Sequence, residues 1–479
     1  METGGLKSFA GEARRQLLSE VRARLELVLA EGSTQRREFA DAVRKLESAV
    51  DEAGGGGSGR VAVVDRVAYT WFNRIVALRF MDANGFTDVG VVSPAADRPD
   101  GQPEVLVEAK RGIIDTDVVA PADAQRIAGL LNGSVTSADP ESEAFGLLLA
   151  AYCRFWNRSM PFMFEHSADY TELLMPADLL SDESVIARAV TVLTPNTCTD
   201  VEVIGWLYQF YIAERKDEVF AGFKKGRKAG AAEIPAATQL FTPDWIVRYL
   251  VDNSLGRLWM LNRPDSNLVN RMEYYIAPVD EETDFLRIDG PEEIKVMDPA
   301  CGSGHMLTYA FDLLFAMYEE DGYNPADIPG LILSKNLFGT EIDQRAGALA
   351  AFALTMKARA RQRTFFTKNV TPNICVLEPV TFSPGELGQL VSRAGDREAE
   401  NAFFVMFTDA DTLGALIQPD EAFLPAIKAR VESLEDADTL FDQDLTQRAR
   451  RVVTQAGYLT SGYHVVVANP PYMGNRNMG

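Results

Sequence analysis

The stretch VMDPACGSGHM, residues 296–306, joins a short apolar run to the start of a helix through a glycine-rich turn. Asp298 stands at the end of the apolar run, Pro299 turns the chain, and Gly302 and Gly304 permit close approach to the backbone. A glycine-rich first turn that faces a helix N-terminus is the arrangement with which open α/β sheets hold nucleotides. The stretch therefore predicts a nucleotide-binding corner at the carboxyl end of a parallel strand.

The spacing of the glycines argues against a pyrophosphate site. It is not Gly-x-Gly-x-x-Gly, and no Gly-Lys-Ser/Thr follows it. A carboxylate at the turn, with no lysine beside it, suits a ligand that carries an ammonium group and lacks phosphates. S-adenosylmethionine is such a ligand.

Beyond residue 238, short apolar runs alternate with segments of helical periodicity. Four runs are candidate strands: EEIKVM (292–297), NLFGT (336–340), NICVL (373–377) and HVVVA (464–468). Alternation of strands and helices predicts right-handed βαβ units and a doubly wound, Rossmann-like parallel sheet. We expect this sheet in a domain over 239–479, with a mostly helical insertion at about 383–460.

A polar residue follows each of the four predicted strands. Glu341 ends the second strand, where acidic residues bind ribose hydroxyls in dinucleotide folds, although a plain surface carboxylate is an equal alternative. Glu378 follows the third strand and is placed to meet an adenine ring. Asn469 follows the fourth, where two prolines stop the strand. With Asp298, these four strand ends predict one composite site.

The segment before residue 239 has a different texture. Residues 1–50 show helical periodicity, DEAGGGGSGR (51–60) has the composition of a flexible linker, and 61–230 are again helical. In VAYTWFNRIVALRFMDANGF (67–86), Trp71, Ile75 and Leu78 share one face of a helix that we expect to end at Asn84. The sequence therefore predicts a helical amino-terminal domain.

Composition restricts the protein class. Hydrophobic residues make up 47% and charged residues 24%, no stretch approaches a membrane span, and the first residues lack a signal-peptide core, so we expect a cytoplasmic protein. The cysteines are widely spaced and only three histidines occur, so neither disulfides nor a metal centre is expected. The formal net charge of −22 is unusual for a nucleic-acid binder.

Three motifs together carry a family resemblance: LFTPDWIVRYLV (240–251), DPACGSG (298–304) and NPPY (469–472). In this order they resemble the γ-order N6-adenine DNA methyltransferases, which depend on S-adenosylmethionine. AYTWFNRIVALRFMDANGF, the helical insertion and NPPYMG extend the resemblance, over essentially the whole chain, to the PglX methyltransferases of BREX phage-defence systems.

The resemblance implies which partners the protein binds and how far the complete protein extends along the sequence. Such proteins bind double-stranded DNA through a target-recognition region and act beside other phage-defence proteins. They continue far beyond NPPY, so we expect the chain to be an amino-terminal fragment whose sheet is incomplete at the carboxyl end. A separate target-recognition region would also account for the missing basic footprint.

The resemblance also assigns roles to residues. Contacts to S-adenosylmethionine are expected from Thr242, Asp298, Ala300, Gly302, Gly304, Glu341 and Glu378. The catalytic corner is expected to comprise Asn469, Pro470, Pro471 and Tyr472. The side-chain oxygen of Asn469 and the Pro470 carbonyl can accept both N–H bonds of an adenine amine, and the Tyr472 ring can stack on a base extruded from the duplex.

Three alternatives remain open from the residues. The same corner would serve another conjugated amine, that of a protein glutamine or an RNA guanine. Pro99-Asp100 followed by Glu108-Ala109-Lys110 echoes a metal-dependent nuclease pattern, a short match that often arises by chance. A non-catalytic fragment that binds cofactor or partner proteins is the third.

Overall fold

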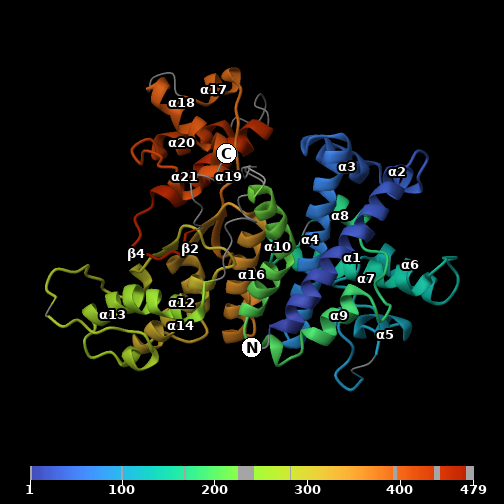
Figure 1. The fold of residues 1–479 in the computed structure, drawn as a ribbon, viewed down its shortest axis with the longest axis horizontal. Helices are drawn as coiled ribbons and strands as arrows, with labels where there is room; N and C mark the ends of the chain where they lie inside the picture. Colours follow the sequence, from blue (N-terminus) through green and yellow to red (C-terminus); the bar gives the residue numbers. More distant parts are fainter. Residues whose placement is uncertain are drawn as a thin grey trace. The chain divides into compact units, whose positions relative to one another are not determined.

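The structure is a computed structural model that describes residues 3–98, 101–164, 166, 169–224, 242–280, 282–391, 396–435 and 443–470 (Figure 1). The chain divides into two compact units, Met1–Glu214 and Arg215–Gly479. This division falls within helix α10 (Glu202–Lys224). The boundary expected from the sequence, between 230 and 239, lies outside the described residues.

Helices joined by loops make up the described residues of the first unit. Its helices are α1 (Gly4–Leu29), α2 (Thr34–Glu38), α3 (Ala40–Glu52), α4 (Gly56–Ala83), α5 (Glu104–Lys110), α6 (Pro121–Leu131), α7 (Pro140–Asn157), α8 (Tyr170–Leu173), α9 (Val185–Val192) and the first part of α10. Helix α4 is the centre of the unit: Trp71, Ile75 and Leu78 are buried as expected, and the helix is capped by Asn84. Helices α1 and α3 pack against α4, so residues 1–50 belong to the same core.

The structure corrects the expected flexible linker at 51–60. Helix α3 ends at Glu52 and α4 begins at Gly56, so only three residues separate them. Gly54 and Gly55 have φ of 104° and 64°, which makes them turn residues. A Cβ at Gly59 would lie 2.1 Å from the Val50 carbonyl oxygen. These glycines therefore serve a tight turn and a close helix contact, two roles that composition alone cannot distinguish from flexibility.

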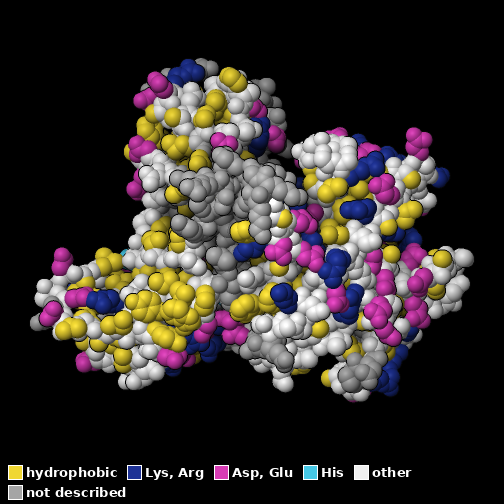
Figure 2. Space-filling model, in the orientation of Figure 1, with side chains coloured by type: hydrophobic (Ala, Val, Ile, Leu, Met, Phe, Trp, Pro, Cys, Tyr) yellow, Lys and Arg dark blue, Asp and Glu magenta, His cyan; other side chains and the backbone are white. Residues whose placement is uncertain are grey.

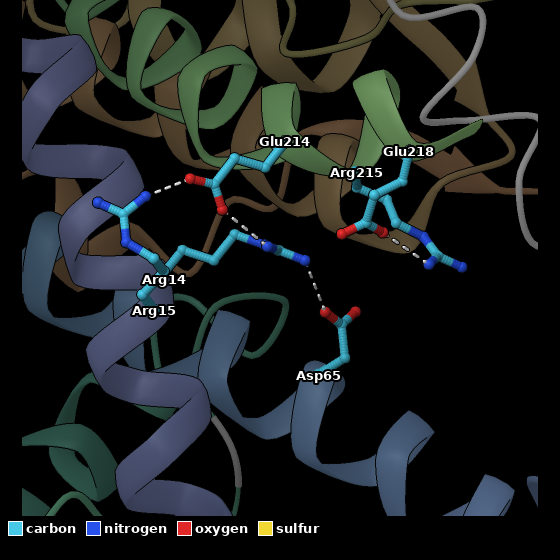
Figure 3. Close-up of polar contacts among 6 residues, drawn as sticks. All are labelled: Arg14, Arg15, Asp65, Glu214, Arg215 and Glu218. Carbon is cyan, nitrogen blue, oxygen red and sulfur yellow. Dashed lines mark hydrogen bonds and ion pairs between the residues drawn. The ribbon is translucent and has the colours of Figure 1, made fainter. Parts of the chain in front are cut away.

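A polar cluster ties three helices of the first unit together (Figure 3). Arg14 of α1 is largely buried, 3.2 Å from Glu214 of α10 and 3.8 Å from Asp65 of α4. Arg15 also pairs with Glu214. Because Arg14 is withdrawn from water, its two carboxylate partners offset the cost of burying its charge.

The second unit is built on a parallel sheet, as the sequence predicted. The strands are β1 (Val296–Asp298), β2 (Leu337–Glu341), β3 (Asn373–Val376) and β4 (Val465–Val466), in the order β3-β2-β1-β4. The chain winds outward from β1 to β3 and then returns to the other side of β1. The carboxyl ends of β1 and β4 therefore flank a switch point, where ligands bind in open parallel sheets.

Helices cover both faces of the sheet. Strand side chains alternate between faces: Ile374 packs with the core beneath α14 (His305–Glu320) and α16 (Gln344–Arg361), whereas Cys375 packs with the helical insertion. On β2, Phe338 likewise meets Tyr458 of the insertion edge to face, at 6.2 Å between ring centroids. The sheet thus lies between two helical layers.

The remaining helices of this unit fall into two groups. Before the sheet come α12 (Asp244–Val251) and α13 (Arg257–Asn262), and α15 (Ile328–Leu331) precedes β2. The insertion between β3 and β4 has its own apolar core and carries α17 (Pro384–Leu390), α18 (Arg397–Val405), α19 (Ala410–Leu413), α20 (Leu424–Glu435) and α21 (Gln443–Thr460). Among the described residues, every helix is too short or too polar to span a membrane.

Candidate functional site at the carboxyl edge of the sheet

The glycine loop between β1 and α14 is tied to the end of β2. The Cys301 N–H donates to the Thr340 carbonyl at 3.0 Å, and the Gly302 N–H donates to Glu341 Oε2 at 2.7 Å. The Ala300 N–H donates to Asp298 Oδ1 at 3.1 Å. Asp298, Ala300, Gly302 and Glu341, which the sequence predicted as site residues, therefore lie around one corner.

Two glycines shape this corner in different ways. Gly302 and Gly304 have φ of 54° and 89°, a region that disfavours other residues. A Cβ at Gly304 would lie 3.1 Å from the Cα of Ala350, so this glycine lets α14 pack closely on α16. A Cβ at Gly302 would meet nothing within 4 Å. Gly304 therefore serves packing, and Gly302 leaves the loop backbone open to a ligand.

The corner brings together buried carboxyl groups. Asp298 is 2% exposed, and burial, with a contribution from Glu341, raises its pKa to about 7. Burial and the neighbouring Asp343 also raise the pKa of Glu341. A cationic ligand beside these carboxyls would favour their charged forms. The residues present therefore fit the ammonium group of S-adenosylmethionine.

Glu341 has a structural function that the sequence did not indicate. Its Oε1 accepts the N–H groups of Ile342 and Asp343 at 2.9 and 3.0 Å, in addition to the bond from Gly302 to Oε2. The carboxylate thus braces the glycine loop from the end of β2. A ribose at this position would share the carboxylate with these amides.

A single hydrogen bond joins the first and last motifs of the site. Asn469 Nδ2 donates to Thr242 Oγ1 at 3.0 Å, across 227 positions of sequence. The bond from the Val467 N–H to the Met297 carbonyl continues the pairing of β4 with β1. It fixes the position of the residues after β4 relative to the end of β1. Thr242 is 8% exposed, whereas Asn469 and Pro470 are exposed. Pro471 and Tyr472 lie outside the described residues.

The position of Thr242 depends on residues that sequence reasoning missed. Thr242 precedes α12, and the fully buried Asp252 follows that helix. Asp252 accepts from the Tyr309 hydroxyl of α14 at 2.8 Å and from the Tyr274 N–H at 3.1 Å. Arg248 lies over the Tyr309 ring at 5.2 Å. No sequence signal links Asp252 to Tyr309, because their pairing arises only when α12 packs against α14.

Glu378 lies at the end of β3 but faces the insertion. Its Oε2 is 3.1 Å from Arg451 Nη1. Its backbone is held by Gln455, which accepts from the Glu378 N–H at 3.0 Å and donates to the Glu378 carbonyl at 3.2 Å. The role of Glu378 in binding adenine stays a prediction, and the partners that the structure gives it come from α21.

An apolar surface borders the corner. Figure 2 shows hydrophobic side chains gathered over α12 and the loops beside α13. Exposed members include Trp245 and Tyr249, which are 56% and 41% exposed and lie one turn apart on α12, and Ile276. Asn253 holds this surface together by donating to the Tyr249 carbonyl and accepting from the Ile276 N–H. Apolar patches of this kind mark interaction surfaces.

The nuclease alternative has no support in the described residues. Glu108 and Lys110 lie on helix α5, where residues two positions apart face different directions. Lys110 instead pairs with Glu141 at 2.7 Å. Pro99 and Asp100, the first half of the pattern, lie outside the described residues.

The fold and the corner define an α/β protein with a buried, carboxyl-rich corner at the switch point of a parallel sheet. Comparison with known proteins agrees: residues 335–479 match the family described as Eco57I restriction-modification methylase. This part of the second unit is therefore similar to a restriction-modification methylase.

Two curated relatives extend the likeness. The chain is 38% identical, over 87% of its length, to the adenine-specific methyltransferase BrxX of Escherichia coli O9:H4 (strain HS), and covers 36% of that protein. It is 32% identical, over 96% of its length, to the adenine-specific methyltransferase PglX of Lacticaseibacillus casei (strain Zhang), and covers 38% of it. The resemblance to PglX is thus confirmed, and the chain spans little more than a third of these relatives' length.

A solved structure also shows a partial likeness. The DrdV–DNA complex, determined by cryo-electron microscopy, aligns with 93% of this chain and 36% of its own at 12% identity, with a TM-score of 0.26. A score this low carries no argument about the fold.

Proposed function

We propose that the chain carries the catalytic core of an S-adenosylmethionine-dependent, site-specific DNA methyltransferase that modifies the N6 amine of adenine in phage defence, in the cytoplasm. In this proposal the parallel sheet is a Rossmann-like methyltransferase sheet. The observation that carries it is the Thr242–Asn469 hydrogen bond. It brings a conjugated-amine acceptor to the switch point, next to the strand that ends in the buried Asp298. The names of the relatives and of the matched family support the same reaction.

The cofactor side of the reaction belongs to the glycine loop. S-adenosylmethionine supplies, when bound, an electrophilic methyl group on a positively charged sulfur. Asp298, with the loop backbone from Ala300 to Gly304, would hold its amino-acid end, because the corner offers a buried carboxyl whose charged form a cation would favour and an open backbone at Gly302. Glu341 would bind the ribose and Glu378 the adenine ring.

The substrate side belongs to Asn469. An adenine amine is a weak nucleophile because its lone pair is delocalised into the ring. Since Asn469 Nδ2 donates to Thr242, the amide is fixed with Oδ1 available to accept an amine N–H. The Pro470 carbonyl would accept the second N–H. Two acceptors draw the nitrogen toward tetrahedral geometry, and this positioning supplies the acceleration without a covalent nucleophile.

The Cys301 thiol has no chemical role in this proposal. It is buried between β1 and α14, and burial raises its pKa well above that of an ordinary thiol. A protonated, enclosed thiol is inert. Cys301 is therefore a packing residue of the loop.

The direct test is methyl transfer from labelled S-adenosylmethionine. The full chain is incubated with double-stranded DNA, with RNA that contains unpaired guanines, and with a glutamine-rich protein, and the modified base or residue is identified by mass spectrometry. We expect label in N6-methyladenine of DNA alone. Label in RNA or protein would establish the alternative amine substrates, and cofactor binding without any transfer would establish the non-catalytic fragment.

A further inference from the structure

The helical insertion meets the sheet at the two strand ends that flank the adenosine half of the proposed cofactor site. At the end of β2, Gly414 approaches so closely that a Cβ there would lie 3.1 Å from Cγ2 of Ile342. At the end of β3, α21 contacts Glu378 through both Arg451 and Gln455. The insertion is therefore built onto the corner and is not a separate appendage.

The contacts to Glu378 differ from ordinary surface packing. Gln455 is 1% exposed, and its side-chain amide accepts from the backbone N–H of Glu378 and donates to the Glu378 carbonyl. A buried amide that pairs with one residue's donor and acceptor replaces the ladder bonds of a neighbouring strand. It fixes the backbone of Glu378 two residues past Val376, the residue of β3 that is in register with Glu341 at the end of β2.

Arg451 contacts the side chain of Glu378, whose backbone is bound by Gln455. It lies one turn before Gln455 on the same face of α21 and contacts Oε2 of Glu378 at 3.1 Å. The ion pair orients the carboxylate. With Oε2 directed to Arg451, Oε1 remains as an acceptor for a ligand.

We propose that Arg451 and Gln455 are positioning residues that make the helical insertion select an adenine-bearing cofactor. They hold Glu378 so that its carboxylate accepts the exocyclic N–H of the cofactor's purine. This inference rests on the proposed function, since it presumes that the corner binds S-adenosylmethionine. It adds a role for the insertion, which would otherwise be a covering layer of the sheet.

The test compares two ligands that differ at position 6 of the purine and, as a consequence, at N1, which accepts in adenine and carries a hydrogen in hypoxanthine. At position 6, S-adenosylhomocysteine carries an amine, and S-inosylhomocysteine carries a carbonyl that cannot donate. A hydrogen bond to a charged acceptor is worth ~1.5–3 kcal/mol, so the unaltered chain should bind the adenosine ligand roughly tenfold or more tightly than the inosine ligand. Both affinities are measured by calorimetry on the full chain.

Arg451→Met should reduce this preference severalfold, toward equal affinity, because the carboxylate loses its orientation. Gln455→Leu should do the same through the backbone, and because its site is buried, thermal unfolding checks that it folds. Arg448→Met is the matched control: Arg448 also lies on α21, but it pairs with Glu386 and Asp444 and donates to the Thr381 carbonyl. The control should keep the full preference.

The outcomes separate the two proposals. Failure of the unaltered chain to bind either ligand overturns the proposed function and this inference together. Binding of S-adenosylhomocysteine without preference over the inosine ligand overturns the inference alone. So does an Arg451→Met variant that weakens both ligands equally and leaves their ratio unchanged, since that is the result of a purely structural contact.

Discussion

Burial of the Asp298 carboxyl lowers the stability of the folded chain at neutral and higher pH. Its pKa, raised to about 7 by burial and by Glu341, means that the folded chain binds a proton that the unfolded chain has lost between about pH 4 and pH 7. Stability must therefore fall as pH rises through this window. A strongly perturbed pKa of this kind is typical of functional sites, which agrees with the ligand role proposed for Asp298.

The first prediction follows from this linkage. Asp298→Asn, which cannot ionise, should be more stable than the unaltered chain above pH 7 by on the order of a few kcal/mol, with the difference shrinking toward pH 4. Urea unfolding of the ligand-free chain at several pH values measures it. Asp289→Asn, at an exposed loop position, is the control for loss of one carboxylate. A difference that grows toward low pH would contradict the raised pKa.

The second residue-scale prediction concerns the amide of Asn469. Thr242→Val removes the hydroxyl that accepts from Asn469 Nδ2 and keeps the shape, so the amide is free to rotate. We expect the rate of methyl transfer to fall about tenfold or more, which corresponds to the loss of one positioning hydrogen bond. Thr242→Ser keeps the hydroxyl and should retain most activity. Single-turnover kinetics of the two variants test this. Equal rates for Thr242→Val and Thr242→Ser would show that the Thr242 hydroxyl does not position Asn469.

At the scale of elements, the glycine loop must let α14 pack on α16 and must leave its backbone open to a ligand. Substitutions at Gly304 and Gly302 can separate these two requirements. Gly304→Ala should destabilise the second unit by about 1–3 kcal/mol, because its backbone conformation is strained for alanine and the added Cβ presses on Ala350 of α16. Gly302→Ala adds a Cβ into open space, so we expect a smaller loss of stability and a larger loss of cofactor affinity. Denaturation and calorimetry on both variants test this division. The same loss of stability in both would show that Gly302 is also a packing residue.

The turn between α3 and α4 gives a second element-scale prediction. Gly57→Ala, with nothing within 4 Å of the added Cβ, should raise stability by about 0.5–1 kcal/mol, because alanine loses less entropy in a helix. Gly59→Ala should lower stability, because its Cβ would overlap the Val50 carbonyl. Thermal unfolding distinguishes them. If both substitutions were neutral, residues 51–60 would behave as the flexible linker that the sequence suggested.

At the scale of the whole molecule, local patterns predicted some features and missed others for physical reasons. The four strands and their polar ends were predictable because apolar runs, turn residues and glycines act locally. The Thr242–Asn469 bond, the Asp252–Tyr309 pair and the hold of α21 on Glu378 join residues 227, 57 and more than 70 positions apart. Such pairings depend on how the elements pack, so local sequence patterns do not predict them. The resemblance named Thr242 and Glu378 but not the partners that position them.

The central claim is that Asp298 and Asn469 serve different ligands at neighbouring strand ends. Measuring cofactor affinity and methyl transfer in parallel, for Asp298→Ala and Asn469→Ala in the full chain, tests it most directly. We expect Asp298→Ala to lose cofactor binding and transfer together, whereas Asn469→Ala should bind the cofactor with unchanged affinity and transfer no methyl group. Equal loss of cofactor affinity in the two variants would contradict it.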